Sequence, residues 1–199
     1  MTPRETVVGS MQVRASYSRF SLEMLEKLPE HQRSRALQAL PSDVVSGVRG
    51  AMPMSWVDLD WHLQLDEALL AVLGDVAYER LCVQMTVEFM QRPLIAPLTG
   101  LGRRLLHRRP HSLLERIPLA WGLVFKDAGS LDVRSLGSQA AELTLRGLPE
   151  AVAKSRGFAL GVVGTLRAVT EYTDVVADVS EVEPGKRFRV AWTDVPHSR

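Results

Sequence analysis

Histidine offers the widest range of chemistry at neutral pH, and this sequence contains five of them. His107 and His111 are four residues apart, a spacing that would place two imidazoles on one face of a helix and could suit a metal ion. Pro110 lies between them and is expected to end that helix, and no HExxH pattern supplies a third ligand. We therefore predict no metal site.

His62 follows Trp61 in an amphipathic segment and is expected at the edge of a packed interface.

A run of arginines is the strongest local charge feature. It consists of Arg103, Arg104, Arg108 and Arg109. Such a run can contact phosphates or an acidic protein surface, but cations also suit the C-terminal end of a helix. The chain as a whole has a net charge of only +1, and no aromatic residues interleave the run. We expect a solvated helix end, with a protein partner as the functional alternative and nucleic acid disfavoured.

Acidic residues and the thiol do not form a recognisable catalytic set. Asp58 and Asp60 are placed to cap a helix, and Asp66 and Glu67 are expected on a solvent-exposed helix face. Cys82, the only cysteine, excludes an intrachain disulfide, and its apolar neighbours favour a buried thiol. Nucleophile-elbow, phosphate-loop, dinucleotide-binding and kinase signatures are absent from the sequence. We predict no catalytic residues and no enzymatic activity. The alternative is an enzyme whose active site matches no recognised motif.

Three glycines, Gly157, Gly161 and Gly164, occur on neighbouring turns of a helix expected to begin at Pro149. A glycine-rich phosphate loop would need a strand-to-helix turn, whereas these glycines fall inside the helix. Mid-helix glycines cost about 1 kcal/mol each, so they require a packing reason. We expect them to let this helix lie close to a sheet or to another helix.

The front half, about residues 1–126, shows helical periodicity. Ser21 is expected to cap a first helix that stops before Pro29, and a short strand or extended arm precedes it. The segment from Ser42 to Ser55 contains glycine and proline breakers and is expected to be irregular, with its role open. The other expected helices cover about His31 to Leu40, Asp58 or Asp60 to Gly74, Asp75 to Phe89, the stretch after Pro93, and Ser112 toward Trp121.

The back half, about residues 127–199, changes to alternating hydrophobicity. Two strands, a helix and two further strands follow one another, joined at Gly137-Ser138 and Pro184-Gly185 by expected turns. The strands are Leu131–Gly137, Ala141–Arg146, Val175–Val179 and Phe188–Trp192. The fold class is therefore α+β, a helical subdomain followed by a β-β-α-β-β antiparallel sheet half. We expect one domain over residues 1–199.

The expected compartment is the cytoplasm. A single cysteine fits a reducing environment, and the first residues lack the apolar stretch of a signal peptide. The longest uncharged apolar run, Gly157 to Leu166, is too short to span a bilayer.

The order of elements resembles that of the heme-nitric oxide/oxygen-binding (H-NOX) domains. It is also similar to the related vinyl-reductase-like (4VR) and TRAPP-type fold. In addition, the chain resembles a paralogous protein family expanded in myxobacteria. The likeness to the myxobacterial family rests on Val8-Gly9-Ser10, the Trp56 segment, Leu145 to Pro149, the glycine helix and the strand ending in Trp192. The resemblance implies a bacterial signalling module with an H-NOX/4VR-like fold.

The H-NOX resemblance also implies a heme site that can be compared residue by residue. H-NOX domains ligate heme iron with a histidine before the sheet, and His107 lies in about that place. They hold the propionates with Tyr-x-Ser-x-Arg, where this chain has Glu142, Thr144 and Arg146. A carboxylate in place of the tyrosine would repel two propionates. We expect no cofactor, with a heme-dependent gas sensor using His107, Thr144 and Arg146 as the alternative.

Together these observations favour a non-catalytic sensor or adaptor domain. It would bind a small apolar ligand, or a protein partner, between the helical half and the sheet, and a homodimer is an open alternative. The residues expected to line that space are apolar or aromatic, namely Trp61, Leu65, Tyr78, Met85, Phe89, Trp121 and Phe158.

Overall fold

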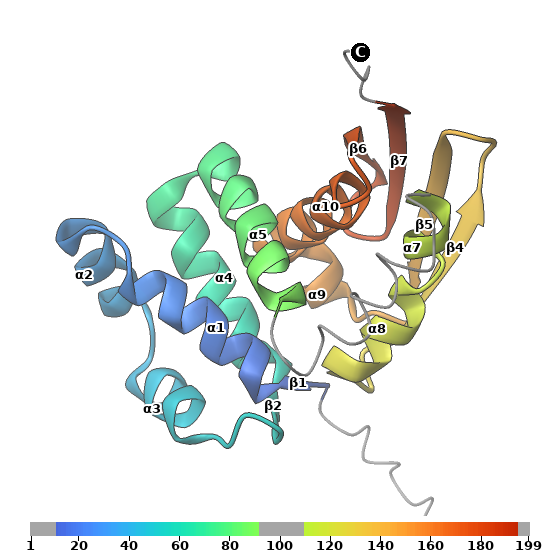
Figure 1. The fold of residues 1–199 in the computed structure, drawn as a ribbon. Coiled ribbons are helices and arrows are strands. Elements are labelled where there is room, and N and C mark those ends of the chain that lie inside the picture. Colours follow the sequence, from blue (N-terminus) through green and yellow to red (C-terminus); the bar gives the residue numbers. More distant parts are fainter. Residues whose placement is uncertain (1–10, 92–109, 195–199) are drawn as a thin grey trace, which may run out of the picture.

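The computed structural model describes residues 11–91 and 110–194. Five helices make up most of the front half, and Figure 1 shows them grouped on one side of the molecule. The helix expected after Pro93 lies outside the described residues. The five are α1 (Ala15–Glu26), α2 (Glu30–Ala39), α3 (Ser42–Gly50), α4 (Leu59–Leu73) and α5 (Asp75–Met90).

Two of these helices differ from the sequence expectation. Helix α1 begins six residues before Ser21, which lies buried inside it and caps nothing. The segment expected to be irregular contains α3, because Val44 and Val48 are buried and stabilise the helix by packing. Gly47 does not break α3, since its missing side chain leaves room for the Trp61 ring: a Cβ there would lie 2.4 Å from the indole. Tertiary packing has overridden local propensity in α3.

Asp58 caps α4 as expected, and Gly74 ends it. The Asp58 carboxylate accepts a hydrogen bond from the backbone N–H of Asp60, at 2.9 Å. Gly74, with φ of +74°, also stands in the cap position of α5, so the expected cap at Asp75 is wrong. Asp75 instead forms an ion pair with Arg156 at 2.9 Å.

A small sheet joins segments that are far apart in the sequence. Strand β1 (Gln12–Arg14) pairs antiparallel with both β2 (Trp56–Asp58) and β3 (Phe125–Lys126), giving the order β2-β1-β3. Strands β2 and β3 were not expected from the sequence, because two or three residues are too few for alternation to show.

The back half has the predicted β-β-α-β-β order. Four antiparallel strands form one sheet in the order β4-β5-β7-β6, with α10 (Arg156–Glu171) between the two hairpins in sequence. The single helix expected from Pro149 is instead two, because Ser155 ends α9 (Glu150–Lys154) and caps α10. The strands are β4 (Ser130–Ser135), β5 (Ala140–Arg146), β6 (Val175–Glu183) and β7 (Arg187–Asp194).

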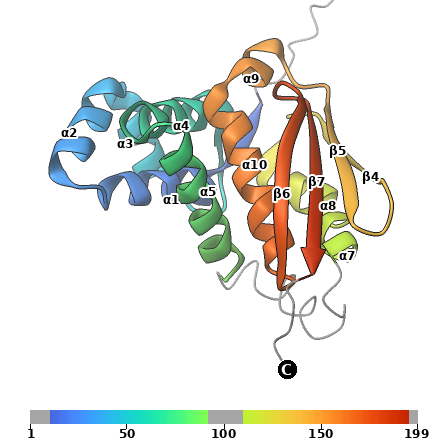
Figure 2. The ribbon, with the colours of Figure 1, turned by 90° about the horizontal axis from the view of Figure 1, so that it is seen from above.

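Helix α10 lies between α5 and the sheet in both views (Figures 1 and 2). On the sheet face toward α10, Leu143, Leu145 and Phe188 are buried, and they share a core cluster with Leu166 of α10. Two shorter helices, α7 (Pro110–Leu114) and α8 (Ile117–Val124), replace the one expected from Ser112. None of the helices within the described ranges is both long enough and apolar enough to cross a bilayer.

Candidate functional site

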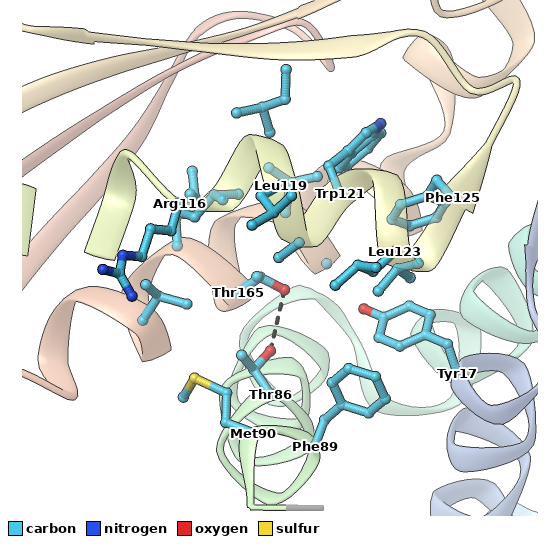
Figure 3. A pocket seen from close by; sticks show the side chains of 18 of the residues that line it. Tyr17, Thr86, Phe89, Met90, Arg116, Leu119, Trp121, Leu123, Phe125 and Thr165 are labelled. Atoms are coloured by element: carbon cyan, nitrogen blue, oxygen red, sulfur yellow. Dashed lines mark hydrogen bonds between the residues drawn. The ribbon is translucent and has the colours of Figure 1, made fainter. Parts of the chain in front are cut away.

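A cavity of about 490 Å³ lies between the helical half and the sheet half. Its lining comes mainly from α1, α4, α5, α7, α8 and α10, and Phe125 of β3, Leu131 of β4 and the flanking residues Arg116 and Tyr172 complete it. Most of the lining side chains are aliphatic or aromatic, and the volume falls within the range of ~300–1,000 Å³ that small-molecule sites occupy. The close-up in Figure 3 shows side chains from α1, α5, α8 and α10 turned toward this space.

Aromatic rings form a continuous wall of the cavity. Tyr17 lies 5.4 Å from Phe89 and 6.0 Å from Phe125, measured between ring centroids, and both pairs meet edge to face. Trp121 lies 4.2 Å from Phe125 and 6.2 Å from Phe158. Such offset and edge-to-face pairs orient one another, so the wall is preorganised rather than a loose collection of side chains.

Helix α8 forms the side of the cavity nearest the solvent. From Ile117 to Val124 it contains no charged residue, and Pro118 suits its first turn. Trp121 is buried, whereas Leu119 and Leu123 line the cavity yet remain 66% and 40% exposed. An apolar helix with exposed leucines beside a cavity places that cavity close to the surface.

The glycine helix has two distinct glycine environments. A Cβ at Gly157 would lie 3.1 Å from the Asp66 backbone, and one at Gly164 would lie 2.6 Å from Cys82 Cβ. These two positions confirm the expected close packing of the helix, here against α4 and α5. Gly161 lines the cavity, and a Cβ there would meet no atom within 4 Å. The third glycine therefore leaves space open.

Three polar side chains stand close together in the cavity wall, and we call Tyr17, His62 and Asp66 the polar cluster. His62 Nε2 lies 3.5 Å from Asp66 Oδ2, and the His62 ring lies 4.8 Å from the Tyr17 ring. Burial raises the pKa of the Asp66 carboxyl, while His62 and a hydrogen bond with Tyr78 act to lower it. Burial, and then the Asp66 charge, also raise the pKa of Tyr17, so its hydroxyl stays protonated at neutral pH.

A second polar feature is a pair of threonines that contact each other in the cavity wall. Thr86 of α5 donates to the Cys82 carbonyl at 2.9 Å, and its Oγ1 lies 3.2 Å from Thr165 Oγ1 of α10 (Figure 3). Because the Thr86 proton is already used, Thr165 is the donor between the two hydroxyls.

The seven residues expected to line the space fall into two groups. Phe89, Trp121 and Phe158 line the cavity. The remaining four pack within core clusters and are not part of its lining: Trp61, Leu65, Tyr78 and Met85. Whether any of the seven binds a ligand stays a prediction.

The residues matched to a heme motif lie on the other side of the sheet. Leu143 and Leu145 of β5 are buried against the core, so Glu142, Thr144 and Arg146 alternate onto the opposite face. There Arg146 pairs with Asp132, and Arg134 pairs with Glu142. These side chains do not fit as a propionate clamp for a group in the cavity.

Several other expectations fall on residues that are not described. His107 and the four arginines of the basic run, Arg103, Arg104, Arg108 and Arg109, lie outside the described residues. His111 is described, and its Nε2 lies 2.8 Å from the Gly137 carbonyl while its ring meets Trp192. Within residues 11–91 and 110–194, no group of three or more histidine, cysteine or acidic side chains could hold a metal ion.

The sequence reasoning missed most of the cavity lining. Tyr17 and Phe125 lie more than 100 residues apart in the chain yet share the wall, and no local pattern links them. One signal was available: the uncharged run Ile117–Val124 is unusual for a short helix and marks an apolar surface on both of its sides.

The comparison with solved structures gives the same fold over nearly the whole chain, although no family model and no curated protein matches. The Fe(II) unliganded H-NOX protein from K. algicida has a TM-score of 0.60 at 11% identity, covering 94% of this chain and 100% of that one. A structure from work on heme distortion in the H-NOX family has a TM-score of 0.58 at 12% identity, covering 94% and 98%. An oxygen-binding H-NOX domain related to soluble guanylate cyclases, in its oxygen complex, has a TM-score of 0.50 at 10% identity, covering 92% and 95%. The chain therefore has an H-NOX-like fold, as its sequence predicted.

Proposed function

We propose that this H-NOX-like chain is a non-catalytic sensor domain that binds a small, mainly apolar ligand in the cavity. The observation that carries the proposal is the 490 Å³ space walled by oriented aromatic rings, at a position where Gly161 contributes no side chain. The likeness to a domain described as oxygen-binding supports a binding role. A cytoplasmic location belongs to the same proposal and is supported by the single, buried thiol of Cys82.

The proposed signal passes through α10. Gly161 and Thr165 of this helix line the cavity, while Gly164 packs directly on Cys82 of α5. Another part of the same helix lies on the sheet, where Leu166 joins the sheet core. A ligand that fills the cavity would bias the position of α10 against both neighbours, and a protein partner could read that change.

Native mass spectrometry of protein purified from its own host tests the proposal. We expect extra mass that is lost on denaturation, because a ligand in an apolar cavity survives gentle desorption. In a Gly161→Phe variant the extra mass should disappear, because the new ring enters the cavity. The matched control is Gly50→Phe at the end of α3, where a Cβ also meets no atom within 4 Å but the cavity is remote. Equal ligand loss in both variants, or a bare mass in the wild type, would count against a ligand-binding cavity and favour the adaptor role.

Heme is the second candidate occupant, because similar solved structures are described as Fe(II) and heme proteins. In that version His107 would be the iron ligand. The described residues argue for a different arrangement, since Arg146 and Thr144 lie on the far face of the sheet. An absorption spectrum distinguishes the two occupants: a Soret band that vanishes in His107→Ala would establish heme, and a colourless protein with extra mass would establish another ligand.

A further inference from the structure

Strand β6 forms one edge of the large sheet and is the longest strand in it. Its nine residues, Val175–Glu183, pair with β7 in the order β4-β5-β7-β6, and Figure 2 shows β6 at the end of that row. Edge strands of this length usually carry a lysine or a proline that prevents a second strand from pairing with them. Strand β6 contains neither residue, and its one irregularity lies at its C-terminal end, between Glu181 and Glu183.

The register of the sheet decides which backbone groups of β6 point out of it. Trp192 donates to the Gln139 carbonyl, so the even-numbered residues of β7 direct their backbone groups toward β5. The odd-numbered residues of β7 therefore bond to the even-numbered residues of β6. The backbone groups of Ala177 and Val179 consequently point away from β7, and among the described residues no hydrogen bond reaches them. This row of unused donors and acceptors can pair with another strand.

A second copy of β6 fits this edge in an antiparallel register centred on Val179. In that register Val176 faces the partner's Val182, and Asp178 faces the partner's Ser180. Both valines lie on the outer face of the sheet, where they are 59% and 46% exposed, so the pairing covers apolar surface twice. A shift of the twofold axis to Asp178 would place two carboxylates directly opposite each other, which is destabilising.

The charges beside this pairing are complementary. Arg189 of β7 lies directly across from Ser180 and on the same outer face. The partner's Asp178 would lie two strand spacings from Arg189, about 10 Å between Cα atoms, and the small Ser180 leaves the path between the two side chains open. Within the described residues, neither Arg189 nor Asp178 has an ion pair of its own, whereas Glu142 on the other side of Arg189 is paired with Arg134.

We infer that the protein forms a homodimer in which two β6 strands pair antiparallel about Val179, so that the two sheets become one continuous sheet. Such a contact is isologous, because the same strand serves both copies. Pairing along one strand covers less surface than a standard interface, so the dimer should be weak and dissociate in the micromolar range. The inference goes beyond the proposed ligand site and does not depend on it, since β6 contributes no residue to the cavity lining.

Sedimentation equilibrium of the full chain tests the dimer across micromolar concentrations. We expect the average mass to rise from 22.1 kDa toward twice that value as the concentration increases. Val182→Lys should weaken the dimer about tenfold, because each pair of valines occurs twice in it. Leu136→Lys is the matched control, since Leu136 is 39% exposed and follows β4 at the opposite edge of the sheet. This control should dimerise like the wild type.

A charge exchange tests the register. Asp178→Arg alone and Arg189→Asp alone should each weaken the dimer about tenfold, because like charges then meet across the axis. The double variant places the opposite charges against each other again and should dimerise within about threefold of the wild type. Recovery in the double variant cannot come from misfolding, because both single changes are still present in it.

Three results would overturn the inference. A mass of 22.1 kDa at every concentration would mean that the edge does not pair. A dimer that Val182→Lys and Leu136→Lys affect equally would place the contact outside β6. A double variant as weak as Asp178→Arg alone would exclude the register about Val179. None of these results affects the ligand cavity, which extra mass in the native spectrum tests separately.

Discussion

Alanine substitutions at two glycines of α10 test the cavity and the helix packing together. Gly161→Ala and Gly164→Ala lie one turn apart in the same helix, so each gains the same helix propensity, about 1 kcal/mol. They differ only in what the new methyl group meets. At Gly161 it meets no atom within 4 Å, whereas at Gly164 it lies 2.6 Å from Cys82 Cβ and 3.0 Å from the Glu79 carbonyl oxygen.

The cost of overpacking at Gly164 follows from subtracting the unfolding free energy of one variant from that of the other. Because the propensity gain is common to both, the difference in unfolding free energy equals the cost of overpacking at Gly164, about 1–3 kcal/mol. Gly161→Ala alone should raise the stability of the ligand-free protein by roughly 0.5–1 kcal/mol, a rise in Tm of about 1–4 °C for a chain of this length.

Urea unfolding followed by circular dichroism measures both values on ligand-free protein. The reasoning is refuted if the two variants have the same stability, since Gly161 would then not face open space or Gly164 would not contact α5. A destabilised Gly161→Ala beside a stabilised Gly164→Ala would reverse the assignment of the two faces of α10. The m-values should match the wild type, which shows that the folded state is unchanged.

Three further substitutions probe the polar cluster, a turn and the outer sheet face. Asp66→Asn removes a buried acid whose folded-state pKa is raised above 3.8. The wild type should therefore gain stability relative to the variant as pH falls through that raised pKa toward 3.8, by up to about 1.4 kcal/mol per pH unit. A stability difference that does not change with pH in urea titrations would contradict the burial of Asp66. Gly185→Ala should destabilise the protein by roughly 2–4 kcal/mol in the same assay, because φ at Gly185 is +64° and a Cβ there would lie 1.9 Å from the Ala153 carbonyl oxygen. Unchanged stability would mean that the turn at Gly185 has a different backbone conformation. Arg146→Ala should change the free energy of unfolding by less than about 1 kcal/mol and leave ligand binding intact, because the ion pair of Arg146 with Asp132 is solvent-exposed. Loss of ligand binding in calorimetry would show that Arg146 contributes to the ligand site.

The back half was predictable because its signals are local. Alternation of apolar residues marks each strand, and Pro184-Gly185 forms a turn closed by a hydrogen bond from the Lys186 N–H to the Glu183 carbonyl at 3.0 Å. A strand buried on one face needs no knowledge of its neighbours to show its period. The H-NOX-like order of elements followed from these strands.

The cavity was not predictable because it depends on packing between distant segments. Gly157, Gly161 and Gly164 look alike in the sequence, and only the positions of α4 and α5 make one of them face open space. Asp66 was interpreted as part of a solvated face, yet α10 packs over it and buries it. Such contacts join residues about 90 positions apart, beyond the reach of any periodicity argument.

The small β2-β1-β3 sheet affects the order in which the chain can fold. Strand β1 is central, and its pairing with β3 joins Gln12 to Lys126 across 114 positions, as the side-chain hydrogen bond between them also shows. During synthesis β1 can pair with β2 early, but its other edge stays unpaired until β3 has emerged. Loop closure over such a separation is entropically costly, so we expect β3 docking to be a late step and the nascent helical half to carry an open strand edge until then.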